Sequence, residues 1–153
     1  MLKKREIFRQ CFENFDYDRI AAYSQADVER IMNTEGMIRS PRKIQAIIHN
    51  AGCCQKVREE FGTFCNYLWS YSDGKTILYR GHDTGRIPVS NGLSEKISKD
   101  LKKRGFKYVG PVTIYSHLQA CGMINDHDAD CPCRKKIVEQ YPAVYKQRYK
   151  EKF

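Results

Sequence analysis

Residues 93–122 constrain the fold more than any other part of the 153-residue chain. Apolar side chains recur at every fourth position at its start, which predicts an amphipathic helix over residues 93–104. Gly105 and Gly110 then bound a short turn, and Pro111 opens a second helix, because proline suits the first turn of a helix. We interpret this segment as two helices joined by a tight hairpin, a helix-hairpin-helix element.

The hairpin has the physical features of an element that holds phosphate groups. Glycine lets backbone amides approach a partner closely, and the start of a helix offers free N–H groups and the positive end of its dipole. Such contacts fix the backbone of a duplex and carry no information about base sequence. The candidate DNA-binding residues are Lys102, Lys103, Arg104, Gly105, Lys107, Gly110 and Thr113. An alternative stays open, since a run of cations also suits the solvated C-terminal end of a helix.

The net charge points to the same kind of partner. The chain has 27 Lys and Arg residues against 18 Asp and Glu residues, which gives a net charge of +9. Such an excess suggests an anionic partner, most commonly nucleic acid, although many proteins are basic for no specific reason. No apolar run is long enough to cross a bilayer, and the N-terminus has no secretory signal. We therefore expect no membrane partner.

The cysteines indicate the compartment. There are seven, an odd number, and most of them lie scattered through apolar stretches. This distribution favours reduced thiols in the core over a disulfide framework. We therefore expect a cytoplasmic protein, and we expect it to be a monomer.

His127 and Cys131 form a weak metal-binding signal in the sequence. They lie one helical turn apart, so both side chains can reach one Zn²⁺. Structural zinc needs four ligands, and Cys133 is a weaker candidate for a third because Pro132 restricts the backbone beside it. On spacing alone, a capping histidine beside a free thiol explains the pair equally well.

Helical patterns extend over most of the remaining chain. The predicted helices outside the hairpin cover Leu2–Phe12, Ser24–Gly36, Ser40–Phe61, Thr63–Tyr71 and Arg134–Lys152, and Thr76–Tyr79 is a predicted short strand. Asp16 and Ser24 are predicted helix N-caps, and so is Ser40 before Pro41. Together these elements predict a single all-α domain over residues 1–153.

Five stretches of the sequence carry a family resemblance. They are Leu2–Glu6, Arg42–Ile48, Lys102–Pro111, Tyr115–Ser116 and Gln119–His127. In this order, and over nearly the whole chain, they resemble the type I DNA-3-methyladenine glycosylases. The resemblance implies an all-α, helix-hairpin-helix DNA glycosylase fold and a structural zinc. It also implies a role in base excision repair, in which the N-glycosidic bond of 3-methyladenine is hydrolysed in alkylated double-stranded DNA.

The resemblance also implies roles for individual residues. His127 and Cys131 match the family's C-terminal pair of zinc ligands, and Ser116 matches a position in the wall of the base pocket. Tyr115 is either a neighbour in that wall or part of the core. Asp126 lies loosely where other helix-hairpin-helix glycosylases carry a catalytic aspartate, and its alternative roles are a helix cap or a hydrogen bond to a zinc ligand.

The resemblance begins partway into the family's sequence. Met1 aligns within an established helix, so we expect this chain to lack the family's N-terminal segment. In the family that segment supplies the other two zinc ligands and most of the base pocket. Two other interpretations stay open: a non-catalytic helix-hairpin-helix module that binds duplex DNA, and a zinc-dependent interaction domain that binds no DNA.

Overall fold

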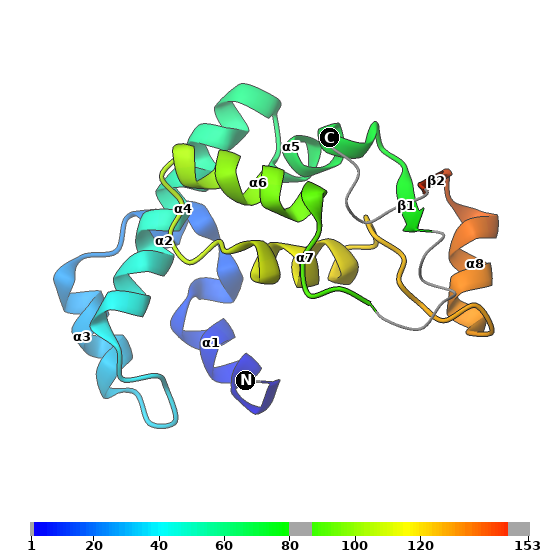
Figure 1. Ribbon diagram of the computed structural model, residues 1–153. Coiled ribbons are helices and arrows are strands. Elements are labelled where there is room, and N and C mark those ends of the chain that lie inside the picture. Colours follow the sequence, from blue (N-terminus) through cyan, green and yellow to red (C-terminus); the bar gives the residue numbers. More distant parts are fainter. Residues whose placement is uncertain (1, 80–86, 147–153) are drawn as a thin grey trace. The chain divides into compact units, whose positions relative to one another are not determined.

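A computed structural model of the chain describes residues 2–79 and 87–146 (Figure 1). The chain divides into two compact units. The first unit comprises Met1–Thr63 with Arg104–Tyr108, and the second comprises Phe64–Lys103 with Val109–Phe153. Helices make up most of the described residues, in agreement with the predicted all-α class. The single domain over residues 1–153 stays a prediction.

The first unit is built from short helices around one long helix. Its elements are η1 (Leu2–Lys4), α1 (Arg5–Cys11), η2 (Glu13–Phe15), α2 (Tyr17–Ala21), α3 (Gln25–Asn33) and α4 (Pro41–Phe61). Both α2 and α3 pack against α4. Phe12, Ile31 and Ile44 are fully buried in the core of this unit. The predicted apolar face of α4 is therefore the surface on which the core is assembled.

Three predicted N-caps can be compared with the structure. The Asp16 carboxylate accepts hydrogen bonds from two N–H groups in the first turn of α2, at 3.0 and 3.2 Å. The Asp27 carboxylate accepts from the Ser24 N–H at 2.9 Å, so Ser24 precedes α3 as predicted. Ser40 stands at the N-cap of α4, but its hydroxyl makes no capping hydrogen bond, so that part of the prediction is wrong.

The second unit contains the other helices and a small parallel sheet. Its elements are α5 (Phe64–Trp69), η3 (Ser70–Ser72), β1 (Thr76–Tyr79), α6 (Gly92–Lys103), α7 (Pro111–Ala120), α8 (Pro132–Gln140) and β2 (Ala143–Lys146). β1 pairs in parallel with β2, with Thr76 opposite Ala143 and Tyr79 opposite Lys146. The predicted strand is confirmed, and all of its residues are buried.

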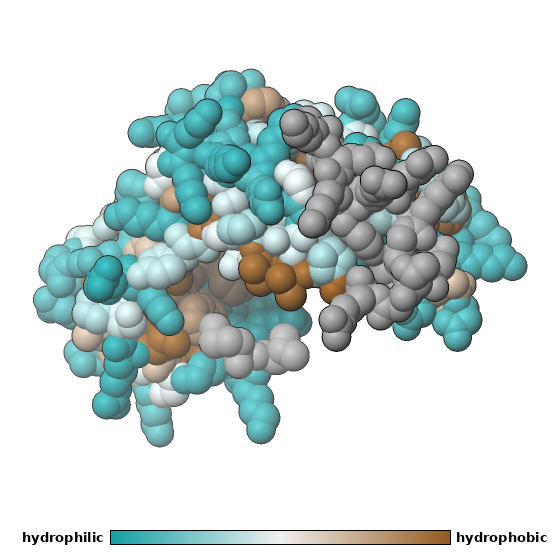
Figure 2. All heavy atoms as spheres, viewed as in Figure 1, coloured by the Kyte–Doolittle hydropathy of each residue, from teal (hydrophilic) through white to brown (hydrophobic). Residues whose placement is uncertain are grey.

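The predicted helix over Arg134–Lys152 is wrong for residues 141–146, and residues 147–152 lie outside the part of the chain that the structure describes. β2 follows α8 as an extended segment up to Lys146, where the described residues end. Pro142 explains the change, because proline cannot continue a helix and holds the preceding Tyr141 in an extended conformation. α8 has no fully buried residue. Figure 2 shows mainly hydrophilic side chains on α8, at the right edge of the view.

Both helices of the predicted hairpin are present. α6 ends at Lys103, and α7 begins at Pro111 as predicted. The two helices pack against each other. The Ser98 hydroxyl donates to the Val109 carbonyl at 2.6 Å, which fixes the chain shortly before α7. In the part of the chain that the structure describes, no helix is both long and apolar enough to cross a membrane.

Candidate nucleic-acid interface

The hairpin turn, Arg104–Tyr108, is fastened to α4 by side chains that the sequence analysis did not single out. The Asn50 Oδ1 atom accepts a hydrogen bond from the Lys107 N–H at 2.8 Å, and Nδ2 donates to the Lys107 carbonyl at 2.9 Å. One side chain therefore satisfies both backbone groups of Lys107. Nε2 of His49 lies 2.9 Å from the Gly105 carbonyl, and it must carry the proton in this bond because a carbonyl only accepts.

The two glycines of the hairpin have different functions. Gly105 has a φ of 92°, a conformation that favours glycine. A Cβ atom there would lie 3.5 Å from Cys53 Sγ and 3.6 Å from His49 Nε2. Gly110 has an ordinary φ of −64°, and nothing lies within 4 Å of such an atom. Gly105 is thus needed to form the turn, whereas Gly110 keeps the start of α7 open, where backbone amides lack partners within the helix.

The cations predicted to bind DNA fall into two groups. Arg104 is held internally, because Nη2 lies 3.1 Å from Oε1 of Glu60 and the guanidinium lies 5.1 Å from the centroid of the Phe61 ring. The exposed members of the predicted set include Lys102, Lys103, Lys107 and Thr113. None of these lysines has an ion-pair partner among residues 2–79 and 87–146. The lysines therefore carry a positive charge that an anionic partner can neutralise.

The residues assigned to the base pocket fall in two places around α7. The Tyr115 side chain is buried, and its hydroxyl donates to Oδ2 of Asp126 at 2.6 Å. Nε2 of Gln119 donates to the same oxygen at 2.8 Å. Ser116 is exposed, and its hydroxyl donates to the Val112 carbonyl at 3.2 Å. The structure thus brings Tyr115 and Asp126 together and does not bring Ser116 into that group.

Asp126 joins the segment after α7 back onto that helix. Its other carboxylate oxygen, Oδ1, is buried and has no hydrogen-bond partner among the described residues. An unpaired buried oxygen is costly, so a donor placed there would be stabilising. Asp126 also lines an open pocket of about 330 Å³, together with Ile87, Gln119, Ala120, Ile124 and His127. The local capping contact is made by Asn125 instead, whose Oδ1 accepts from the His127 N–H at 3.2 Å.

His127 and Cys131 lie close enough to bind one metal ion together. Nδ1 of His127 is 3.7 Å from Sγ of Cys131, close to the ~3.6 Å that separates a nitrogen and a sulfur ligand of tetrahedral zinc. No group of three or more potential metal ligands occurs in the described parts of the chain. The pair therefore fits half of a structural zinc site.

The same His-x₃-Cys spacing occurs at two other places, His49–Cys53 and His117–Cys121. Nε2 of His49 and Sγ of Cys53 lie 3.6 Å apart. That histidine bonds the turn through the Gly105 carbonyl. Spacing and proximity alone therefore do not identify a metal site, and the chemistry of the other neighbours has to be considered.

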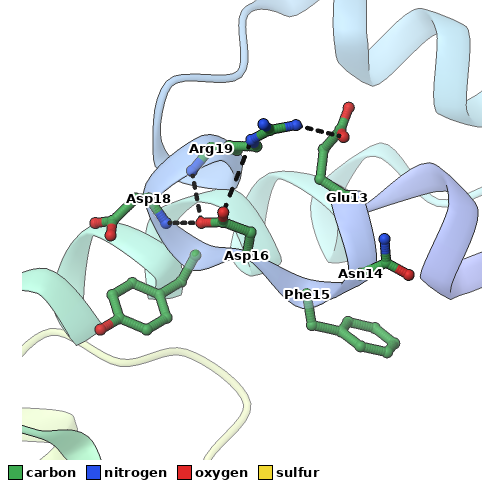
Figure 3. Close-up of a pocket in the computed structure, with 7 residues that line it drawn as sticks. Glu13, Asn14, Phe15, Asp16, Asp18 and Arg19 are labelled. Carbon is green, nitrogen blue, oxygen red and sulfur yellow. Dashed lines mark hydrogen bonds and ion pairs between the residues drawn. The ribbon is translucent and has the colours of Figure 1, made fainter.

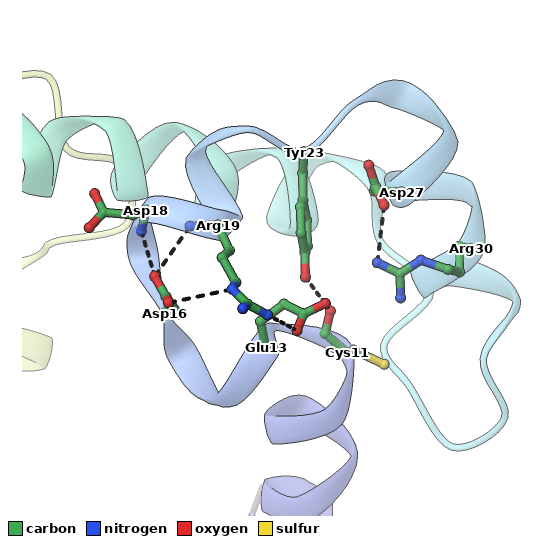
Figure 4. A network of polar contacts seen from close by, with 8 residues as sticks. All are labelled: Cys11, Glu13, Asp16, Asp18, Arg19, Tyr23, Asp27 and Arg30. Carbon is green, nitrogen blue, oxygen red and sulfur yellow. Dashed lines mark hydrogen bonds and ion pairs between the residues drawn. The ribbon is translucent and has the colours of Figure 1, made fainter.

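Acidic side chains gather around α2, but they have structural partners. Figure 3 shows Glu13, Asp16 and Asp18 beside a surface pocket, and the first two pair with Arg19. Asp18 accepts from Arg58 at 2.7 and 2.9 Å, and these hydrogen bonds hold the pKa of the carboxyl below its ordinary value. Figure 4 shows these carboxylates within a wider network of caps and ion pairs. We therefore assign them a role in stability.

Sequence and fold are both similar to proteins of one family. A family model described as methyladenine glycosylase matches residues 1–135. The chain is 42% identical over 133 residues to DNA-3-methyladenine glycosylase 1 of Escherichia coli, which covers 87% of this chain and 71% of that protein. It is 36% identical over 134 residues to the DNA-3-methyladenine glycosylase of Haemophilus influenzae, with coverage of 88% and 72%.

A solved structure agrees with these similarities. It is that of 3-methyladenine DNA glycosylase I from Staphylococcus aureus, which describes recognition of 3-methyladenine. The TM-score is 0.79 and the identity 35%, over 87% of this chain and 71% of that one. The predicted fold is therefore confirmed, and the chain belongs to the methyladenine glycosylase family.

Proposed function

We propose that this chain removes 3-methyladenine from alkylated double-stranded DNA by hydrolysing the N-glycosidic bond. The observation that carries the proposal is the 42% identity over 133 residues to an E. coli protein named for this activity. Two properties of the chain give further support. A net charge of +9 suits a DNA partner, and the hairpin turn is fixed while its Lys107 stays exposed.

The proposed reaction needs the DNA to be held more than it needs a strong acid. 3-Methyladenine in DNA is cationic, so it can leave as a neutral base with the electron pair of the glycosidic bond. A water oxygen then bonds to the sugar carbon and loses a proton to solvent. The target base lies inside the duplex, so its nucleotide has to be flipped out of the stack first. Negative charge near the sugar stabilises the oxocarbenium-like transition state, and DNA phosphates supply part of it.

In this proposal the hairpin holds the backbone of the duplex. In the second unit, amides at the start of α7 and the exposed Lys102 and Lys103 offer donors and charge to phosphate oxygens, and in the first unit the exposed Lys107 offers its charge. Phosphate contacts carry no base information, so selection has to come from the flipped nucleotide itself. This division suits an enzyme that searches DNA of any sequence for one damaged base.

Asp126 is our candidate among the described residues for contact with the cationic base. Tyr115 and Gln119 hold one carboxylate oxygen, and the other has no partner within the described chain. An N–H of a cationic base could donate a charge-assisted hydrogen bond to that free oxygen. Ser116, which is exposed on α7, is a second candidate for the wall of the base pocket.

The test is release of free 3-methyladenine from methylated duplex DNA, followed by chromatography with mass detection. We expect release by the parent chain and slower release by Asp126→Asn, with unchanged affinity for DNA. Asp128→Asn is the matched control, because it makes the same change at an exposed neighbour. No release, with salt-dependent DNA binding retained, would favour a non-catalytic DNA-binding module. Salt-insensitive binding, or none, would favour an interaction domain.

We also propose that His127 and Cys131 supply two ligands of a structural zinc. The 3.7 Å between their donor atoms supports this, although a complete site needs two more donors than the described residues bring together. The test is zinc content per chain after dialysis, measured by plasma mass spectrometry. Cys131→Ser should lose zinc and Cys133→Ser should keep it. Equal zinc in the parent and in Cys131→Ser would contradict the proposal.

A cytoplasmic monomer completes the proposal. All seven cysteines are free thiols, which suits a reducing compartment. The predicted core position holds only for Cys11 and Cys53, because Cys65, Cys121 and Cys133 are exposed. Size-exclusion chromatography with light scattering in reducing buffer should give the mass of one chain, and a dimer mass would contradict this part.

A further inference from the structure

The hairpin turn and α4 form an open pocket, and of its lining residues Lys107 alone belongs to the predicted DNA-binding set. It has a volume of about 560 Å³ and is lined by Arg42 and Gln45 from the N-terminal end of α4, and by Lys107 and Tyr108 from the turn. All four residues belong to the first unit. Two of them are cations and none is acidic, so the pocket offers a positive surface to a partner.

The side chains of the two cations are available to a ligand. Arg42 and Lys107 are exposed, and neither forms an ion pair with any residue that the structure describes. One helix positions the backbones of both residues. α4 carries Arg42, and it also carries Asn50, which binds the backbone of Lys107. The backbone positions that carry the two cations are therefore fixed before a ligand arrives, which lowers the cost of binding.

Tyr108 adds an aromatic surface to the pocket. Tyr108 is 59% exposed, whereas the neighbouring aromatic residue of the turn, Phe106, is buried. The Tyr108 φ of 60° lies in the left-handed region, which a residue with a side chain rarely adopts. Such conformations cluster at ligand sites. An exposed ring beside cations is a combination with which proteins bind nucleic acid strands.

We propose that this pocket binds a phosphodiester group of the DNA, with Arg42 and Lys107 on its oxygens and the adjacent sugar against Tyr108. The proposal rests on the proposed function and adds α4 to the elements that contact DNA. A guanidinium matches phosphate because its N–H groups can donate to two oxygens at once. The Gln45 amide can donate to the same group.

The experiment measures the salt dependence of binding to a labelled DNA duplex by fluorescence anisotropy. Loss of one phosphate contact in Arg42→Ala should lower the slope of log Kd against log salt by about 0.9 and weaken binding several-fold. Arg42→Lys keeps the charge and should restore the slope. Arg39→Ala is the matched control, since Arg39 is exposed nearby but does not line the pocket. Tyr108→Ala should weaken binding without changing the slope.

Each outcome decides the matter. A parent-like slope in Arg42→Ala, while Lys107→Ala lowers it, would overturn the pocket and leave the proposed function standing. An equal fall in Arg42→Ala and Arg39→Ala would also overturn it, because general charge would then explain the effect. A parent chain with no salt-dependent binding would overturn the proposed function as well. Unchanged circular dichroism confirms that the variants compared are folded.

Discussion

Helix α4 makes polar contacts on two sides, to α2 and to the hairpin turn, and the two sets differ in kind. Toward α2, the Arg58 side chain pairs with the Asp18 side chain. Toward the turn, Glu60 pairs with the Arg104 side chain, and Asn50 also bonds the backbone of Lys107. Contacts between side chains join elements but allow the backbone to adjust. Contacts to the backbone fix its conformation, so we expect the first set to serve stability and the second to shape a binding surface.

The largest effect is expected at Gly110, directly before α7, which tests whether the hairpin binds DNA. Gly110→Val should fold normally, because the φ is ordinary and the space around it is open. Its side chain would keep a phosphate away from the amides of α7, and losing two hydrogen bonds of ~1.4 kcal/mol each weakens binding about 100-fold. A gel-shift titration measures this. Unchanged affinity would exclude the start of α7 as a phosphate site.

A smaller effect is expected at Asn50. Asn50→Ala removes both hydrogen bonds to Lys107, so the turn loses its fixed conformation and DNA affinity falls about tenfold, with ~1 kcal/mol less stability. Asn50→Asp keeps an acceptor for the Lys107 N–H, so its DNA affinity should lie between that of the parent chain and that of Asn50→Ala. Hydrogen exchange at the amide of residue 107 measures how firmly the turn is held, and it should be measured on the same variants as the DNA affinity. Faster exchange with parent affinity would show that the fixed backbone does not matter for binding.

The smallest effect on DNA binding is expected at Arg58. Its hydrogen bonds lower the pKa of Asp18 in the folded protein, so their contribution to stability is present above the ordinary value of 3.8. That contribution is lost as the pH falls through the lowered pKa. Arg58→Ala should therefore melt earlier than the parent at neutral pH, and the difference should vanish in strong acid. Thermal melts at both pH values test this. If Arg58→Ala lost as much DNA affinity as Asn50→Ala, the two sets of α4 contacts would not differ in function.

Local patterns predicted the helices well, and they failed where distant segments meet. The helical spacing of apolar residues predicted the course of α4 to Phe61. The strand at Thr76–Tyr79 was also predicted, but its partner Ala143–Lys146 was interpreted as helix. A parallel pair joins segments far apart in sequence, so neither segment alone indicates the other.

The candidate site was predicted in part for a similar reason. Glycines and proline indicated the hairpin, because these residues have specific backbone preferences. Asn50 was missed, since a polar residue on a helix is ordinarily interpreted as solvent-exposed. The available signal was weak: asparagine is a poor helix former, and this one lies in the middle of a 21-residue helix. Only the folded chain shows that the Lys107 backbone lies beside it.

The contacts of the turn also restrict its length. Phe106 is buried and Lys107 is bonded by Asn50 at both of its backbone groups, so these neighbours occupy two different, fixed positions. Inserting or deleting one residue before Phe106 would shift a different side chain into each position. The turn can therefore exchange the side chains that point to solvent, while the number of residues between α6 and α7 has to stay the same.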